Sequence, residues 1–513
     1  MNRMLCGLAA LVVAAAGVAI TANPAAAAAA AIADSGQVDV EFERPIYVTN
    51  RGVAFDFSTG PHVVSRYAID LTGRLVPRGE PVATVDGARG IVFTPDARFA
   101  YVVGENDHAI AAYRVGAGGR LIPLGPPIPT GGLNPFGIAI APDGRHLYVA
   151  NLFSHTISVF TILASGQPVP LGDPVATGVP NARNVAVSRD GRFLFVAHGA
   201  PPDLNPDVVK TLPINPDGSL GTPTFTAPIG VIGTGLVISP DGRFLYVGCS
   251  GTHDVHGFRI GPHGELHPVP HSPFLANNTP DGMAFTPDGQ RLFVSSVATQ
   301  PQLVPGEVGL WTFTVNDDGS LTTVGRRLDA AGGGGGAIVA PGGRHLLVTD
   351  FFDNNVAAYE TDTLRQLPGS PQPSNGLAPS LNSVATLPNL GPRASFTARS
   401  HANLVTFDAV TSTDEDGRIA RYHWNFGDGT TLADGGLRPS HTYRQPGTYR
   451  ATLTVTDNEG CSTSLLYTGY TPLCVGSTAA RTAQPVRIGT TPTVSVSEQP
   501  PLAVVGKAVD RSI

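Results

Sequence analysis

The stretch that decides the fold is Ala141-Pro-Asp-Gly-Arg-His-Leu-Tyr-Val-Ala-Asn151, because its pattern recurs through the first three quarters of the chain. Proline fixes one turn dihedral, aspartate hydrogen-bonds the backbone ahead of it, and glycine accepts a left-handed conformation, so the stretch begins with a predicted hairpin turn. The apolar residues after the turn predict a strand. Related copies begin at Thr94, Ser188, Ser239, Thr286 and Ala340. A seventh copy lacks the turn and stands first, as Ile46-Tyr-Val-Thr-Asn50.

Equivalent turn residues are nearly evenly spaced. The intervals are 47, 47, 51, 47 and 54 residues, taken in order through Asp96, Asp143, Asp190, Asp241, Asp288 and Gly342. A period of this length, with four strand signals in each unit, is typical of propeller blades. Seven units therefore predict a seven-bladed β-propeller over residues 36–390.

The first unit lacks its innermost strand. Residues 382–388, at the far end of the array, have the inner-strand pattern. We therefore expect residues 383–387 to pair with residues 46–49, so that one blade is built from both ends of the domain and no open sheet edge remains.

The repeats resemble a known group of propellers. With the literal Tyr47-Val-Thr-Asn50 among them, they are similar to the YVTN repeats of seven-bladed propellers, a group that includes the lactonase family and surface-layer-type propellers. The resemblance implies the fold over residues 36–390. It leaves the function open, because this scaffold carries both enzymes and binding proteins.

The pattern changes after Pro388. Residues 391–488 contain Trp424-Asn-Phe-Gly-Asp-Gly429, His441-Thr-Tyr443 and an alternating strand that ends at Asp457. These spaced elements resemble the PKD domain, an immunoglobulin-like β-sandwich. The sequence thus predicts an all-β chain, with a propeller followed by this sandwich and a flexible tail over residues 489–513.

Residues 1–33 read as a signal peptide, with Arg3 followed by an apolar run and an alanine-rich stretch. An N-terminal membrane anchor is the alternative, but the run is short and small residues follow it. We expect a secreted, extracellular protein with no membrane span after cleavage. In an oxidising compartment Cys461 and Cys474, which are 13 residues apart, are expected to form a disulfide, leaving Cys249 as a free thiol.

Composition excludes some functions. The chain has a net charge of -7 and its only lysines are Lys210 and Lys507, which argues against a nucleic-acid partner. Common catalytic and phosphate-binding motifs are absent, no cofactor is expected to be required, and a monomer is expected. Calcium is the one candidate ion, at Asp414, Asp416 and Asp457, and turn-forming carboxylates are the alternative interpretation of these residues.

The candidate site lies on the propeller face opposite the Pro-Asp-Gly-Arg turns, while the turn face is expected to carry only the repeated turn. The residue after each Tyr-Val-x pattern should be equivalent in register, which gives a ring of Asn50, Gly104, Asn151, His198, Cys249, Ser296 and Asp350. From this ring and the nearby loops we take as candidate catalytic residues Arg89, Arg183, His198 and Asp281. The candidate ligand-binding residues are Asn50, Glu105, His108, Asn151, His155, His253 and Asp350. The asparagines have the alternative role of bonding loop backbone.

Two functions from different classes remain open. The first is an extracellular or cell-surface protein that binds a polysaccharide or another protein. The second, which the resemblance implies, is a lactonase-like hydrolase of the 6-phosphogluconolactonase type that acts on a small extracellular lactone. In it an arginine would polarise the lactone carbonyl and a histidine or carboxylate would activate water. Arginines and histidines converging in a deep channel favour the enzyme, and a shallow or glycine-filled mouth favours binding.

Overall fold

The computed structural model describes residues 44–52, 59–199, 207–276, 279–297, 309–327 and 334–489. The predicted signal peptide over residues 1–33 and all but the first residue of the predicted tail lie outside these ranges. Within them the fold is all-β, with two short 3-10 turns, η1 at Ala117–Gly119 and η2 at Thr478–Ala480. No helix among the described residues has the length and apolar character needed to cross a membrane.

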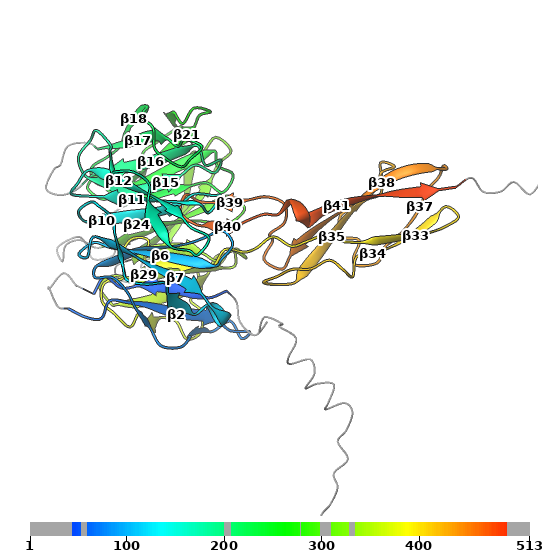
Figure 1. Ribbon diagram of the computed structural model, residues 1–513, viewed down its shortest axis with the longest axis horizontal. Helices are drawn as coiled ribbons and strands as arrows, with labels where there is room; N and C mark the ends of the chain where they lie inside the picture. The colour runs from blue at the N-terminus through cyan, green and yellow to red at the C-terminus, as the bar shows by residue number, and fades with distance from the viewer. Residues whose placement is uncertain are drawn as a thin grey trace, which may run out of the picture. The chain divides into compact units, whose positions relative to one another are not determined.

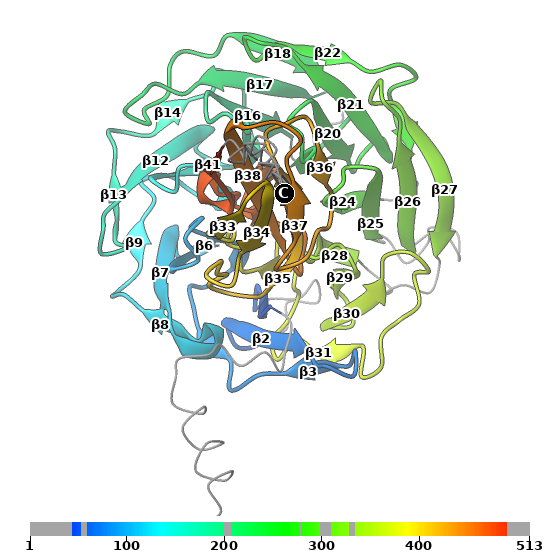
Figure 2. The same cartoon turned by 90° about the vertical axis from the view of Figure 1, so that its right-hand side faces the viewer.

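Seven sheets form the propeller, and Figure 2 shows them arranged as a ring around a common centre. Blade one contains β32 (Val384–Thr386), β1 (Ile46–Thr49), β2 (Val63–Ile69), β3 (Leu75–Pro77) and β4 (Val82–Ala83). Blade two contains β5 (Ala88–Phe93), β6 (Phe99–Gly104), β7 (Ala109–Val115), β8 (Leu121–Pro123) and β9 (Ile128–Pro129). Blade three contains β10 (Pro135–Ile140), β11 (His146–Asn151), β12 (Thr156–Ile162), β13 (Pro168–Pro170) and β14 (Val175–Ala176).

The remaining blades repeat this order from the innermost strand outward. Blade four contains β15 (Ala182–Val187), β16 (Phe193–His198), β17 (Val208–Pro213) and β18 (Phe225–Pro228). Blade five contains β19 (Gly233–Ile238), β20 (Phe244–Cys249), β21 (Asp254–Ile260), β22 (Leu266–Pro268) and β23 (Phe274–Leu275). Blade six contains β24 (Thr279–Phe285), β25 (Arg291–Val297), β26 (Gly309–Val315) and β27 (Leu321–Arg327). Blade seven contains β28 (Gly334–Val339), β29 (His345–Asp350), β30 (Asn355–Glu360) and β31 (Gln372–Pro373).

The repeated turn forms as its residues dictate. In blade three the Asp143 carboxylate accepts a hydrogen bond from the backbone N–H of Arg145 at 2.9 Å, and Gly144 has a φ of 71°. A residue with a side chain is strained at such a φ, so glycine fits this position.

The tyrosine of the Tyr-Val-x pattern joins neighbouring blades. The Tyr148 hydroxyl donates a hydrogen bond to the carbonyl of Gly218, in the outer turn of the next blade, at 2.9 Å. Equivalent bonds join Tyr47 to Gly119, Tyr101 to Gly166 and Tyr246 to Gly319. Where Phe195 replaces the tyrosine, Thr211 supplies the hydroxyl and donates to Gly264 at 2.9 Å. Hydroxyl groups at this level therefore fasten each of blades one to five to the blade that follows it.

The prediction of ring closure is confirmed. Strand β32 pairs antiparallel with β1, with Ile46 opposite Thr386, Tyr47 opposite Ala385 and Val48 opposite Val384. Blade one is thus built from both ends of the domain, and the inner edge of β1 is covered.

The C-terminal module is a sandwich of two sheets. One contains β33 (Thr397–His401), β34 (Leu404–Asp408) and β37 (Ser440–Thr442), and the other β36 (Thr431–Leu432), β35 (Ile419–Asn425), β38 (Gly447–Asp457) and β41 (Arg481–Ile488). Trp424 is fully buried between them against Phe396 and Phe407, and its indole N–H donates to the carbonyl of Gly436 at 3.0 Å. This packing gives the module its own core.

The insertion after Asp457 contains a separate hairpin of β39 (Leu466–Tyr467) and β40 (Pro472–Cys474), labelled in Figure 1. The expected disulfide between Cys461 and Cys474 is present, with a Cα–Cα distance of 5.5 Å. Cys249 is a free, buried thiol, and burial raises its pKa. The expectation that the turn face carries only repeated turns is wrong, because the hairpin packs against the turn-face ends of the inner strands. Three of its residues, Thr468, Tyr470 and Thr471, bond Ile238, Ile140 and Phe93 there.

Candidate functional site

The predicted ring of residues after Tyr-Val-x is buried between strands and loops. Asn50, Asn151, His198, Cys249, Ser296 and Asp350 are each fully buried. The Asn50 side-chain amide donates to the carbonyl of Ser374 at 2.8 Å, and that of Asn151 donates to the Ser158 hydroxyl at 2.7 Å. The Asp350 carboxylate accepts hydrogen bonds from the backbone of Phe352 and Asp353. These residues fix the loops in place, as the alternative interpretation of the asparagines anticipated, and none of the seven lines the cavity of the central channel.

The predicted histidines do not converge. His108 and His155 have φ values of 52° and 59°, and their Nδ1 atoms lie 3.1 Å and 2.8 Å from the backbone nitrogens of Asn134 and Asn181 in the next blade. His253 has the same backbone conformation, with a φ of 61°. His108 and His155 brace loops between blades, whereas the buried Nδ1 of His253 has no hydrogen-bond partner among the described residues.

His198 cannot act as an exposed base. Its Nδ1 lies 2.8 Å from the carbonyl of Pro180, and burial lowers its pKa to about 4, so that the imidazole is neutral at pH 7. A neutral, fully buried ring without access to solvent is a structural element here.

A different ring surrounds the channel. In blades two to seven the pairing between the first and second strands shifts register near the start of the inner strand, which marks a β-bulge. Bulges re-aim side chains and are common next to functional sites. The residues at these irregularities are Arg89, Phe136, Arg183, Thr234, Asp281 and Gly335. We refer to these six residues as the bulge ring. It brings together three of the four candidate catalytic residues.

Arg89 is held by its neighbours. Its guanidinium donates to the Glu105 carboxylate at 2.7 Å and 2.9 Å and to the Ser380 hydroxyl at 2.9 Å. Arg51 pairs with the other oxygen of the same carboxylate. Burial disfavours charge on Glu105, but the two guanidinium groups outweigh it and keep the pKa of Glu105 below its ordinary value. Arg89 is therefore a fixed, neutralised part of the ring.

Phe136 links the two arginines of the ring. Its aromatic centroid lies 4.0 Å from the guanidinium carbon of Arg89 and 4.6 Å from that of Arg183. The Phe136 side chain packs with Leu152 and Leu381 in a small buried cluster. These cation–π contacts fix both guanidinium groups at the channel.

Arg183 and Asp281 form fewer side-chain hydrogen bonds than Arg89. Arg183 makes a long hydrogen bond of 3.3 Å to the carbonyl of Gly199, and its buried Nε has no hydrogen-bond partner within the described part of the chain. Burial lowers the pKa of Arg183 to about 10, partly offset by the charge of Asp281. Burial also raises the pKa of Asp281, while Arg183 and Arg89 act in the opposite direction. The two described side chains form no direct ion pair, so each can contact a bound molecule.

The channel next to the ring is apolar. A cavity of about 60 Å³ is lined by Ile138, Val237, Met283 and Ile338, with Tyr470 of the hairpin loop on one side. Glycines in the inner strands permit close contact between strands, since a Cβ on Gly235 would lie 2.4 Å from the carbonyl oxygen of Asp281.

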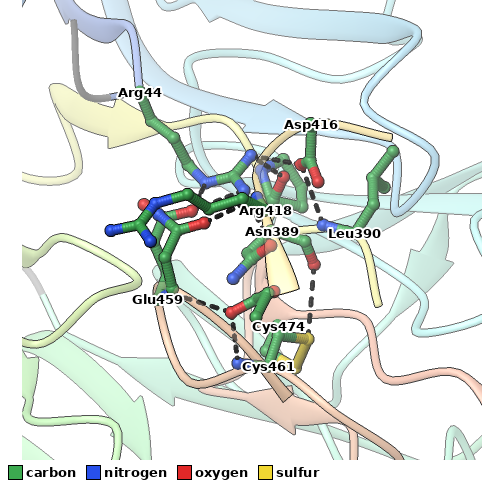
Figure 3. A network of polar contacts seen from close by, with 11 residues as sticks. Arg44, Asn389, Leu390, Asp416, Arg418, Glu459, Cys461 and Cys474 are labelled. Carbon is green, nitrogen blue, oxygen red and sulfur yellow. Dashed lines mark hydrogen bonds and ion pairs between the residues drawn. A yellow bond between two sulfur atoms is a disulfide. The ribbon is translucent and has the colours of Figure 1, made fainter. Parts of the chain in front are cut away.

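A second polar cluster lies around Arg44. Its guanidinium bonds the carboxylates of Asp416 and Glu459 and the side-chain oxygen of Asn389, as Figure 3 shows. Beside it, both carboxylate oxygens of Asp414, one of Asp416 and one of Asp457 are buried and have no hydrogen-bond partner among the residues that the structure describes. Burial, with the charges of Asp416 and Asp457, raises the pKa of Asp414 to about 7. Several unsatisfied carboxylate oxygens are a donor set that fits Ca²⁺.

Comparisons with known families agree with this architecture. The family described as a lactonase, 7-bladed β-propeller, matches residues 57–202, and the PKD domain family matches residues 389–469. The chain carries a lactonase-type seven-bladed propeller and a PKD domain.

The lactonase-type propeller is similar to several solved structures. A putative 6-phosphogluconolactonase of Bacteroides uniformis has a TM-score of 0.54 at 20% identity, covering 67% of this chain and 99% of that one. The periplasmic gluconolactonase of Pseudomonas aeruginosa has a TM-score of 0.54 at 21% identity, with the same coverage of 67% and 99%. At these identities the likeness concerns the fold.

The PKD domain is similar to parts of larger proteins. A microbial collagenase of Vibrio alginolyticus is 37% identical over 83 residues, which are 16% of this chain and 10% of that protein. The pre-pro-metalloprotease PrtV of Vibrio cholerae is 39% identical over 80 residues, 16% of this chain and 8% of that protein. The similarity therefore spans a tenth or less of each relative.

Proposed function

We propose that the protein is an exported hydrolase that opens a small lactone at the bulge ring of the propeller. The observation that carries the proposal is the pair of Arg183 and Asp281, two partly buried groups of opposite charge in the bulge ring that form no ion pair with each other. Groups with shifted pKa values and free bonding capacity are typical of catalytic sites. The predicted signal peptide over residues 1–33 supports export.

The geometry supports a hydrolytic sequence of steps. Arg183 donates a hydrogen bond to the lactone carbonyl oxygen and stabilises the negative charge that develops when water attacks the carbonyl carbon. Asp281, as a carboxylate, accepts a proton from that water. The tetrahedral intermediate then expels the ring oxygen, which takes the proton from Asp281, and the product is a hydroxy acid.

The raised pKa of Asp281 suits this role, since a stronger base accepts a proton more readily near neutral pH. Arg89 and Phe136 act as positioning residues, because Arg89 is already neutralised by Glu105 and Phe136 contacts both arginines.

The test is hydrolysis of a panel of unsubstituted γ- and δ-lactones by the protein without residues 1–33. We expect Asp281→Asn to lower kcat by about 100-fold or more. Asp143→Ala, on the turn face, should leave kcat unchanged and lower the melting temperature, because it removes the hydrogen bond to Arg145. Binding of lactones without turnover, or full activity of Asp281→Asn, would refute the hydrolase proposal.

A second proposed function is attachment to an extracellular polysaccharide or protein through the PKD domain. The sandwich exposes Leu404, Val410 and Leu432, whose side chains are 40%, 58% and 42% accessible. The matched stretches of a collagenase and a metalloprotease support an accessory role of this kind. Cosedimentation of the mature protein with insoluble collagen or polysaccharide tests it, and Val410→Asp with Leu432→Asp should abolish the cosedimentation while lactone hydrolysis continues.

We also propose that Asp414, Asp416 and Asp457 hold Ca²⁺. The unpartnered buried oxygens and the raised pKa of Asp414 support this assignment. A cation at these atoms would offset the repulsion between the negative charges of the three carboxylates. Arg44 would then remain bound to Glu459 and Asn389 at the edge of the site.

A further inference from the structure

The hairpin of β39 and β40 belongs by sequence to the C-terminal module but bonds the propeller. The backbone N–H groups of Ile140, Val187 and Ile238 donate to the carbonyls of Tyr470, Gly469 and Thr468 at 3.1, 3.0 and 3.0 Å. The N–H of Phe93 donates to the Thr471 hydroxyl at 3.2 Å. Each donor is the last residue of an inner strand, in blades three, four, five and two respectively. The hairpin therefore satisfies groups that would otherwise point into the channel.

Close packing fixes the hairpin. Tyr467 is fully buried, and its hydroxyl lies 2.5 Å from the carbonyl oxygen of Ile140. Gly469 has a φ of 107°, and a Cβ there would lie 2.7 Å from the side chain of Ala186. At its base, Cys474 is joined to Cys461. The hairpin is thus a built part of the channel wall.

Tyr470 reaches from the hairpin toward the bulge ring. Its hydroxyl donates to the carbonyl of Leu236, in the middle of β19, and accepts from the side-chain amide of Asn184 at 3.3 Å. Asn184 directly follows Arg183 in β15. The tyrosine therefore spans from the turn-face end of the inner strands to the layer next to the bulge ring.

The cavity beside Tyr470 begins one residue beyond Arg89, at Gly90, and two residues beyond Asp281, at Met283. Its walls are largely apolar, with Asn382 as a polar residue, and Thr468, Thr471 and Leu473 of the hairpin close it toward the turn face. A molecule that meets Arg183 and Asp281 and extends toward the turn face would pass the Tyr470 hydroxyl and then lie between the apolar walls and the tyrosine ring.

We infer that the hairpin makes the channel a one-ended pocket, in which the Tyr470 ring limits the space and the largely apolar walls select a lactone with a short alkyl substituent. This inference rests on the proposed function for the reacting group, while the preference for an alkyl chain rests on the cavity alone. Each methylene buried against the walls should raise kcat/KM about fourfold until the chain reaches Tyr470, and longer chains should lose that gain.

The experiment is a chain-length series of γ-alkyl lactones, from methyl to octyl, with wild type, Tyr470→Ala and Met283→Phe. Wild type should show an optimum at a short chain, Tyr470→Ala should move the optimum to longer chains, and Met283→Phe should move it to shorter ones. Tyr443→Phe, a change of a tyrosine in the core of the C-terminal sandwich, should leave the optimum in place. Peptide mapping of the Cys461–Cys474 disulfide and the melting temperature verify that each variant keeps the hairpin.

A parallel binding series keeps this inference separate from the hydrolase proposal. The probes are 2-alkylcyclopentanones, which carry the ring carbonyl and the chain but cannot be hydrolysed, and binding is measured by calorimetry. If no lactone is hydrolysed, but ketone binding depends on chain length and its optimum shifts in the two variants, the hydrolase proposal is refuted and the pocket is supported. An optimum that neither Tyr470→Ala nor Met283→Phe shifts, in hydrolysis or in binding, would overturn the pocket.

Discussion

Replacing Arg183 by glutamine tests the site most directly. Glutamine keeps a hydrogen-bond donor of shorter reach and removes the positive charge that acts on Asp281. Two effects follow from the structure, one on the rate and one on the pH dependence of the rate.

The rate effect follows from the lost guanidinium. Removing a single donor that stabilises the charge on a carbonyl oxygen costs about 100- to 1000-fold in kcat. The pH effect follows from the environment of Asp281, whose pKa is raised by burial and lowered by Arg183 and Arg89. Without Arg183 the lowering is smaller, so the pKa of Asp281 rises further. Because the carboxylate is the active form, the acidic limb of the pH–rate profile should move to higher pH.

The assay is kcat against pH for wild type, Arg183→Gln and the control Arg145→Gln, whose arginine is exposed on the turn face. In wild type the alkaline limb should follow Arg183, with a pKa of about 10, and this limb should disappear in Arg183→Gln. A loss in kcat below tenfold, or an acidic limb that moves to lower pH, would show that Arg183 does not act on the carbonyl and on Asp281 as argued. Equal losses in the control variant would point to a general effect of the lost charge.

Three further outcomes are expected. Adding Ca²⁺ should raise the melting temperature more at pH 8 than at pH 5, because Asp414, with a pKa raised to about 7, is neutral at the lower pH. The variant Asp414→Asn should remove this difference. Equal melting temperatures in calcium and in a chelator at pH 8 would contradict the site. Replacing Cys461 and Cys474 by serine should lower the free energy of unfolding by about 3 kcal/mol in denaturant titrations, and an unchanged midpoint would argue that the hairpin needs no covalent tie. Tyr148→Phe should cost about 1–3 kcal/mol by leaving the Gly218 carbonyl unsatisfied, whereas a change within experimental error would mean that water replaces the bond.

The architecture could be predicted because it is periodic. The turn residues repeat at intervals close to 47, and the absence of an inner strand before Ile46 could only be compensated at the other end of the array. Ring closure and the disulfide followed from the same kind of counting.

The burial of the ring could not be predicted from register alone, because the residue after Tyr-Val-x ends the second strand, where side chains such as His198 turn into the packed interior. The channel residues come instead from the bulge at the start of the inner strand. The bulge itself carries a weak signal, a small or glycine residue beside Arg89, Phe136 and Asp281. The hairpin carries no period at all. The insertion bounded by the two cysteines contains Tyr467 and Tyr470. These two tyrosines were the only indication that the hairpin packs on another domain.

The pairing of β1 with β32 has a consequence for how the protein is made. Ile46 and its partner Thr386 are 340 residues apart, so the first strand to leave a ribosome or an export channel must wait for almost the whole propeller before its inner edge is covered. Until then an apolar strand of four buried residues presents unpaired backbone groups, which is the state in which chains associate wrongly. The inner strands of blades two to five receive their last hydrogen bonds later still, when residues 468–471 arrive. As the chain emerges, β32 therefore becomes available to close the ring before the hairpin of β39 and β40 becomes available to bond the inner strands. The C-terminal module thus completes the propeller that precedes it.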